Sequence, residues 1–198
     1  MRALSKTVAF ASLAFGLSVA GAAAGPLSVV NVSAPQTNCV WNVTCIVTVS
    51  DSAGNFTPPG DTDGARVQSR TYPGTPPAPA AGRMAYVYRV DMTAAKAVTA
   101  ANCVTGMIID FGTVIPFPYS AKGNADVFVV TQGGLGSVAV ASATQSGTAI
   151  KFVFTAPVCP GATSYFFGLG SKSTTPQPGK AQLIYSLGGT GVADDRVP

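Results

Sequence analysis

The sequence predicts an all-β protein: a two-layer antiparallel β-sandwich, immunoglobulin-like or jelly-roll-like, with about ten short strands. Three observations carry this prediction. Apolar and polar residues alternate with a period of two in several segments. The 22 Gly and 15 Pro of the 198 residues gather between these segments, as is typical of turns and long Pro/Gly-rich loops. Helical spacing of apolar residues extends over one or two turns at most.

Three segments show the alternation most clearly: 84–92, 103–111 and 148–155. Each is expected to be a half-buried strand, with one face in the core and the other in solvent. In the first segment, Arg89 and Asp91 fall on the predicted solvent face. The residues expected to face the core are Tyr86, Tyr88, Val90, Met107, Ile109, Phe111, Ile150, Phe152 and Phe154.

The remaining elements have weaker patterns. The continuous Val/Phe run at 126–131 predicts a strand covered on both faces. Residues 51–64 and 73–82 are rich in Gly, Pro, Asp and Ala and are predicted to be long loops. A short helix is predicted at 93–101, with Thr93 as its cap. The other predicted strands are 27–33, 45–50, 65–72, 137–144, 163–168 and 181–186.

The first 24 residues have the pattern of a secretory signal peptide. Arg2 and Lys6 precede an apolar run, and small residues end at Ala24, where cleavage is expected. The apolar run is shorter than the ~20 residues that span a bilayer. Residues 25–198 are then expected to form a single β-sandwich domain without a membrane span, in a secreted or periplasmic protein. The Ala-rich composition is typical of bacterial exported proteins.

Missing residue types exclude several functions. The chain has no histidine, and its eight acidic residues are all aspartate. A Ser-His-Asp or Cys-His mechanism and a His-ligated metal are therefore excluded. No cluster of Lys and Arg exists to follow phosphates, so nucleic acid is not an expected partner. Without His, we also expect stability to be nearly independent of pH between roughly pH 5 and 8.

The four cysteines of an exported chain are expected to form two disulfides. The alternation from Cys39 to Cys45 resembles one long strand, which would hold these two about 20 Å apart and prevent their pairing. Asn42, a turn former, favours the opposite arrangement, in which a turn brings them together. We prefer Cys39–Cys45 with Cys103–Cys159.

One loop could bind a cation. Asp61-Thr-Asp63-Gly places two carboxylates and a glycine together, which is how oxygen-ligand calcium sites often begin. The alternative is a turn in which the aspartates bond their own backbone. Calcium is thus the only cofactor that the sequence suggests, with Asp61 and Asp63 as ligands.

Aromatic residues suggest a second kind of site. Trp41, the single tryptophan, could be a platform for a sugar ring or a core residue packed against a disulfide. Tyr165, Phe166 and Phe167 follow one another, so alternation turns at least one outward unless a second layer covers it. Trp41, Tyr165 and Phe167 are the predicted ligand-binding residues.

These observations favour an exported, non-enzymatic β-sandwich that acts as a surface, matrix or binding module. The first alternative is a carbohydrate-binding module, with calcium as its possible cofactor and a glycan or surface component as partner. The second is a hydrolase that uses aspartate only, for which Asp91 and Asp110 could pair across neighbouring strands.

Overall fold

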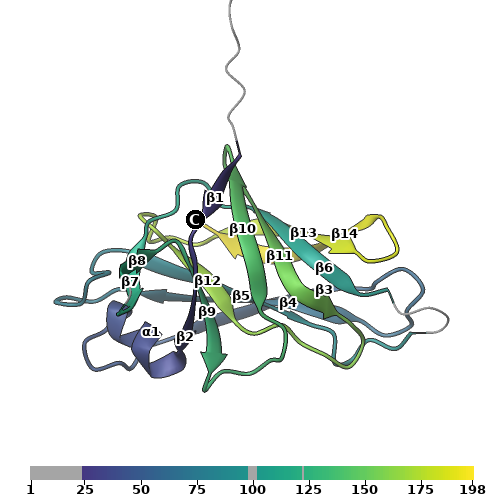
Figure 1. Ribbon diagram of the computed structural model, residues 1–198, viewed down its shortest axis with the longest axis horizontal. Coiled ribbons are helices and arrows are strands. Elements are labelled where there is room, and N and C mark those ends of the chain that lie inside the picture. The colour runs from purple at the N-terminus through teal and green to yellow at the C-terminus, as the bar shows by residue number, and fades with distance from the viewer. Residues whose placement is uncertain (1–23, 98–101, 122) are drawn as a thin grey trace, which may run out of the picture.

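The computed structural model describes residues 24–97, 102–121 and 123–198, and it confirms an all-β sandwich (Figure 1). The first sheet has six strands, in the order β1 (Gly25–Leu27), β10 (Val140–Ser146), β11 (Ala149–Val158), β6 (Val104–Asp110), β13 (Gln177–Tyr185) and β14 (Thr190–Val197). The second sheet also has six, in the order β2 (Val29–Ser33), β9 (Val127–Gln132), β12 (Phe167–Ser171), β5 (Met84–Asp91), β4 (Ala65–Pro73) and β3 (Ser50–Phe56).

The first residues of the domain join the two sheets. β1 pairs with β10 in the first sheet, and after Ser28 the chain enters the second sheet as β2. The carboxylate of Asp126 accepts bonds from the backbone N–H and the hydroxyl of Ser28, at 2.8 and 2.7 Å. β2 then runs parallel to β9, whereas all other strand pairs are antiparallel.

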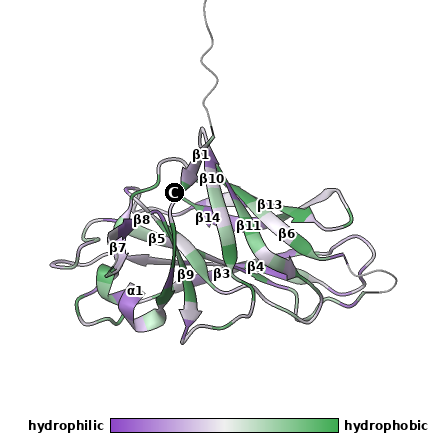
Figure 2. Ribbon diagram, viewed as in Figure 1, coloured by the Kyte–Doolittle hydropathy of each residue, from purple (hydrophilic) through white to green (hydrophobic). Residues whose placement is uncertain are grey.

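The inner faces of the two sheets form the main core. All nine residues predicted to face the core are buried in it, and Asp110 is exposed as expected. Figure 2 shows hydrophobic residues distributed along the strands of both sheets. Because aromatic and branched side chains from both sheets interdigitate here, this layer supplies most of the apolar burial that stabilises the sandwich.

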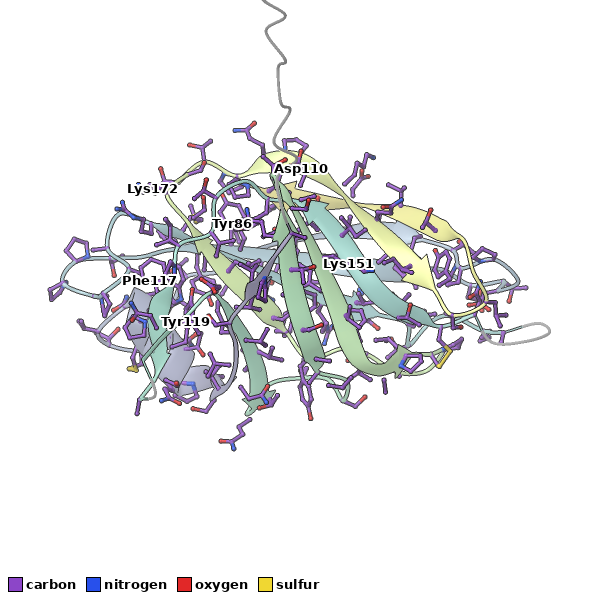
Figure 3. All side chains as sticks on the ribbon, turned by 45° about the horizontal axis from the view of Figure 1, so that its top comes forward. Tyr86, Asp110, Phe117, Tyr119, Lys151 and Lys172 are labelled. Carbon is purple, nitrogen blue, oxygen red and sulfur yellow. A yellow bond between two sulfur atoms is a disulfide. The ribbon has the colours of Figure 1, made fainter. Side chains whose placement is uncertain are left out.

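A second apolar layer covers part of the outer face of the second sheet. It is formed by α1 (Ala34–Trp41) and by the small sheet of β7 (Phe117–Ser120) and β8 (Gly123–Ala125). Figure 3 shows Phe117 and Tyr119 at the end of the molecule where α1 lies in Figure 1. A Cβ on Gly168 would lie 2.7 Å from the Phe128 ring, and one on Gly170 would lie 2.4 Å from that of Phe117. The two glycines of β12 therefore let both rings lie directly on the sheet.

Both predicted disulfides are confirmed: Cys39–Cys45 and Cys103–Cys159. The first closes a turn in which the Cys45 N–H donates to the Asn42 carbonyl at 2.7 Å. Because this turn folds the chain back, the predicted strand 45–50 is wrong except at Ser50, where β3 begins. Two disulfides indicate an oxidising compartment.

Several other sequence-based assignments need correction. The predicted loop 51–64 is wrong in its first part, because residues through Phe56 pair with β4 as strand β3. Residues 93–97 are not helical, and 98–101 lie outside the described residues, as does the predicted signal peptide up to residue 23. The helix α1 and the strands β7, β8 and β14 were not predicted. In the part of the chain that is described, no helix is long and apolar enough to cross a membrane.

Candidate functional site

An apolar groove lies on the outer face of the second sheet, beside α1. It has a volume of about 210 Å³. Its floor consists of side chains from β4, β5 and β9 together with Phe166, and its walls are α1, the 42–49 segment and the 133–135 turn. The groove is lined by Ala34, Asn38, Val47, Val49, Arg70, Tyr72, Val87, Phe128, Val130, Gly133, Gly134, Leu135 and Phe166.

Exposed aliphatic side chains lie at the rim of the groove and in the 42–49 segment that forms one of its walls. Leu135, in the turn after β9, is 65% exposed, and Ile46 in the 42–49 segment is 73% exposed. The Cys39–Cys45 disulfide ties the start of this segment to α1. Val43 and Val49 are exposed in the same segment. Of these residues, Leu135 and Val49 line the groove itself, and exposed aliphatic side chains beside an apolar hollow are typical of a binding surface.

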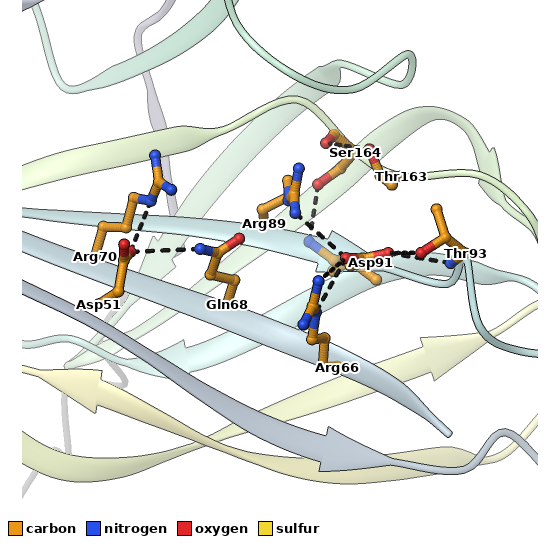
Figure 4. Close-up of polar contacts among 10 residues, drawn as sticks. Asp51, Arg66, Gln68, Arg70, Arg89, Asp91, Thr93, Thr163 and Ser164 are labelled. Carbon is orange, nitrogen blue, oxygen red and sulfur yellow. Dashed lines mark hydrogen bonds and ion pairs between the residues drawn. The ribbon is translucent and has the colours of Figure 1, made fainter. Parts of the chain in front are cut away.

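A row of three arginines borders the groove on strands β4 and β5. Arg66, Arg70 and Arg89 project from the outer face of the second sheet, between Asp51 of β3 and Asp91 of β5 (Figure 4). The guanidinium groups of Arg70 and Arg89 lie 4.2 and 4.8 Å from the centre of the Phe166 ring. Phe166 lines the groove, so this row adjoins the apolar site.

Asp91 is fully engaged by its neighbours. One oxygen accepts bonds from Arg66 at 2.8 and 3.0 Å and from Arg89 at 3.3 Å, and the other accepts two from Thr93 at 2.6 and 3.1 Å. Burial raises its pKa, but the bonds from Thr93 and Arg66 outweigh burial and bring the pKa below its usual value. The residue is 4% exposed, so the prediction that it faces solvent is wrong.

Arg89 was also predicted to face solvent, and this prediction is wrong as well. The residue is 8% exposed, because Phe166 and its neighbours cover it, and its Nε has no hydrogen-bond partner. Burial lowers the pKa of its guanidinium, and the proximity of Asp91 offsets this only in part. The sequence shows the alternation correctly, yet it does not reveal that a second layer covers this face.

A second polar site lies at the edge where the two sheets approach each other. Here β14 packs against β3, and a cleft of about 250 Å³ is lined by residues of both, Asp195 included. Asp195 is 6% exposed, and neither carboxylate oxygen has a hydrogen-bond partner. Burial, followed by the charge of Asp194, raises its pKa to about 7 even though Lys180 lowers it. The sequence does not single out this residue, because Asp195 lies in a polar stretch without alternation.

The aromatic residues predicted to bind ligand do not form a surface. Trp41 is fully buried in the second layer, where its ring contacts Phe117 and Tyr72 at centroid distances of 5.1 and 5.7 Å. Phe167 is fully buried in the main core, and Tyr165 is partly buried against it. Trp41 and Phe167 therefore present no ring face to a ligand, and Trp41 has the core role that was its alternative.

The two aspartates of the predicted calcium site lie in the loop between β3 and β4. Asp63 forms an ion pair with Lys96 at 3.1 Å. The carboxylate oxygens of Asp61 have no hydrogen-bond partner, and burial raises its pKa. Among residues 24–97, 102–121 and 123–198, no three acidic or Cys side chains gather as a metal cluster. A cation here would depend on Asp61, Asp63 and backbone carbonyls.

Calcium binding at this loop has a direct test. If Asp61 and Asp63 are ligands, millimolar Ca²⁺ should raise the melting temperature, because a ligand that binds only the folded state stabilises it. Asp63→Asn should abolish the rise, whereas Asp110→Asn, which removes an exposed carboxylate on β6 in the first sheet, should leave it intact. Equal melting curves in calcium and in chelator would show that both aspartates only shape the loop.

The aspartate pair suggested for hydrolysis is not formed. Asp91 lies on β5 of the second sheet and Asp110 on β6 of the first, so they are not on neighbouring strands. Comparison with known proteins gives no further guide to the site: no family model, no curated protein and no solved structure matches the chain.

Proposed function

We propose that the protein is exported after cleavage of a signal peptide near Ala24 and acts, without catalysis, as a surface or matrix binding module. The groove on the second sheet is its binding site, and an apolar group is what it holds. The two disulfides agree with export. The observation that carries the proposal is the apolar groove itself, whose lining includes the solvent-exposed Val49 and Leu135.

The dimensions of the groove restrict the ligand. A volume of about 210 Å³ is below the ~300–1,000 Å³ of pockets that enclose a drug-sized molecule. A short alkyl chain or one large apolar side chain suits it better. The carbohydrate-binding alternative is less well supported, because of its three proposed aromatic residues only Tyr165 is even partly exposed.

Binding of the neutral fluorescent probe N-phenyl-1-naphthylamine tests the proposal. Leu135→Ser should weaken probe binding roughly three- to tenfold, since Leu135 would lose part of the ~1.5–3 kcal/mol that burial of a leucine supplies. Leu187→Ser is the matched control: Leu187 is also 65% exposed but lies in the turn between β13 and β14, outside the groove. Equal losses in the two variants, or no probe binding to the wild type, would contradict the proposal.

A further inference from the structure

The arginine row beside the groove carries more positive than negative charge. Three guanidinium groups face two carboxylates, and both carboxylates are already bonded. Asp51 accepts from Arg70 at 2.7 Å, and Asp91 is shared by Arg66 and Arg89. One positive charge is therefore left without a counter-charge in this cluster.

The uncompensated charge is located mainly at Arg89. A guanidinium has five N–H donors, yet within the described residues the Arg89 guanidinium makes one hydrogen bond, at 3.3 Å to Asp91. This bond is longer than the two from Arg66 to the same oxygen. The Arg89 Nε has no hydrogen-bond acceptor, although the residue is only 8% exposed. A buried charge with so few hydrogen-bond partners destabilises the folded state unless a further group binds to it.

The position of this charge connects it to the groove. Arg70 lines the groove, and the Phe166 ring contacts the guanidinium groups of both Arg70 and Arg89. An anion placed next to Arg70 at this end of the groove would therefore lie close to the Arg89 charge as well. Guanidinium groups bind carboxylates with matching planar geometry, and a single excess charge matches a monoanion.

We infer that the ligand of the groove is an amphiphilic carboxylate, with a short apolar chain in the groove and its carboxylate at Arg70, close to the charge of Arg89. This inference rests on the proposed function, because it names the ligand class of the same site. The apolar lining accounts for retention of the chain. The arginine row accounts for selection of anionic over neutral or cationic amphiphiles.

Three eight-carbon ligands test the inference: octanoate, octanol and octylammonium, each titrated to displace N-phenyl-1-naphthylamine. Octanoate should displace the probe at a concentration about tenfold lower than octanol, because a hydrogen bond to a charged group is worth about one factor of ten or more. Octylammonium should be the weakest. Each experiment uses the full domain, and Arg89 is left unchanged because it is buried.

Two substitutions should shift octanoate in opposite directions. Arg70→Gln should weaken octanoate about tenfold and leave octanol unchanged. Asp51→Asn removes the carboxylate that competes for Arg70, so it should strengthen octanoate roughly threefold. Lys151→Gln is the control, because it removes one positive charge from β11 on the opposite sheet, where Figure 3 shows Lys151.

The outcomes separate this inference from the proposed function. Equal affinity for octanoate and octanol would overturn the inference but would leave the proposed binding of an apolar group in the groove supported. Preference for octylammonium, or equal weakening by Arg70→Gln and Lys151→Gln, would also overturn it. If none of the three ligands displaces the probe, the inference is wrong. If the probe itself does not bind, the proposed function is wrong as well.

Discussion

Replacing Asp195 with asparagine should stabilise the protein at pH 8 by up to about 4 kcal/mol and remove most of the dependence of its stability on pH. The folded state holds this proton up to a pKa of about 7, whereas the ordinary value is 3.8. Each pH unit between these values corresponds to about 1.4 kcal/mol. Asparagine keeps the size and shape of the protonated side chain but cannot ionise.

Whether the free energy of unfolding rises or falls with pH depends on which state, folded or unfolded, keeps the Asp195 proton. Between about pH 4 and 7, the unfolded chain has lost the Asp195 proton and the folded protein has kept it, so the free energy of unfolding falls as pH rises. The stabilising contribution of protonated Asp195 is complete below the unfolded-state pKa of 3.8, and it is lost as the pH rises through the folded-state pKa of about 7. Asp91 acts oppositely: its lowered pKa contributes stability above 3.8 that is lost only in stronger acid.

The surroundings of Asp195 explain why its charge is disfavoured. Asp194 repels it, and Lys180, which would attract it, is bonded to the Asp194 carboxylate. The guanidinium of Arg196 is directed to Ser50 and Asp51 of β3. The hydroxyl of Tyr88 donates to the Arg196 carbonyl at 2.7 Å, and the charge of Asp195 raises the pKa of this tyrosine after burial has done so.

Urea unfolding at pH 4.5, 6 and 8 measures the effect. The wild-type protein should lose stability steadily across this range, so the near-independence of pH expected from the absence of His is wrong for a chain with this buried carboxyl. Asp195→Asn should give a nearly flat profile. Asp110→Asn serves as control, because Asp110 is exposed on β6. A flat wild-type profile, or an Asp195→Asn protein that is less stable than the wild type at pH 8, would mean that the carboxylate is paired or hydrated in solution.

Trp41→Ala should cost roughly 3–5 kcal/mol of stability, the usual range for removing a large buried aromatic side chain. The Trp41 ring is fully buried and contacts Tyr72, Phe117 and Tyr119. Its carbonyl also accepts from the Thr75 N–H at 2.8 Å, so the end of α1 is connected to the 74–83 loop. Removal of the indole would leave a cavity in the layer that supports the groove.

Chemical denaturation should detect this loss directly. Trp41→Phe should cost less than Trp41→Ala, because it keeps a ring among the other aromatic side chains and removes an indole N–H that has no partner. Val43→Ala is the control: Val43 is close in sequence but 53% exposed, so its effect should stay within about 0.5 kcal/mol. A cost below about 1 kcal/mol for Trp41→Ala would contradict the buried position and favour a surface role for this residue.

The sequence by itself determined the fold class, the main strands and the disulfides. In β5, β6 and β11 the alternation of apolar side chains reflects burial of one face against the core, and this local signal is sufficient to place Tyr88, Met107 and Phe152 correctly. Asn42 indicated the turn that brings Cys39 and Cys45 together. Such features depend on neighbours within a few residues along the chain.

The tertiary structure decided where the charged residues lie and where a ligand could bind. Arg89 is buried because Phe166, far away in the sequence, lies against its guanidinium. Asp91 is buried because Arg66, Arg89 and Thr93 surround its carboxylate and the distant Thr163 forms a β-bridge with its backbone. Asp195 is buried because β14 packs against β3, which lies some 140 residues earlier in the sequence. Alternation along a strand reveals which residues share a face, but burial of that face depends on what packs against it, and this is set only when distant segments assemble.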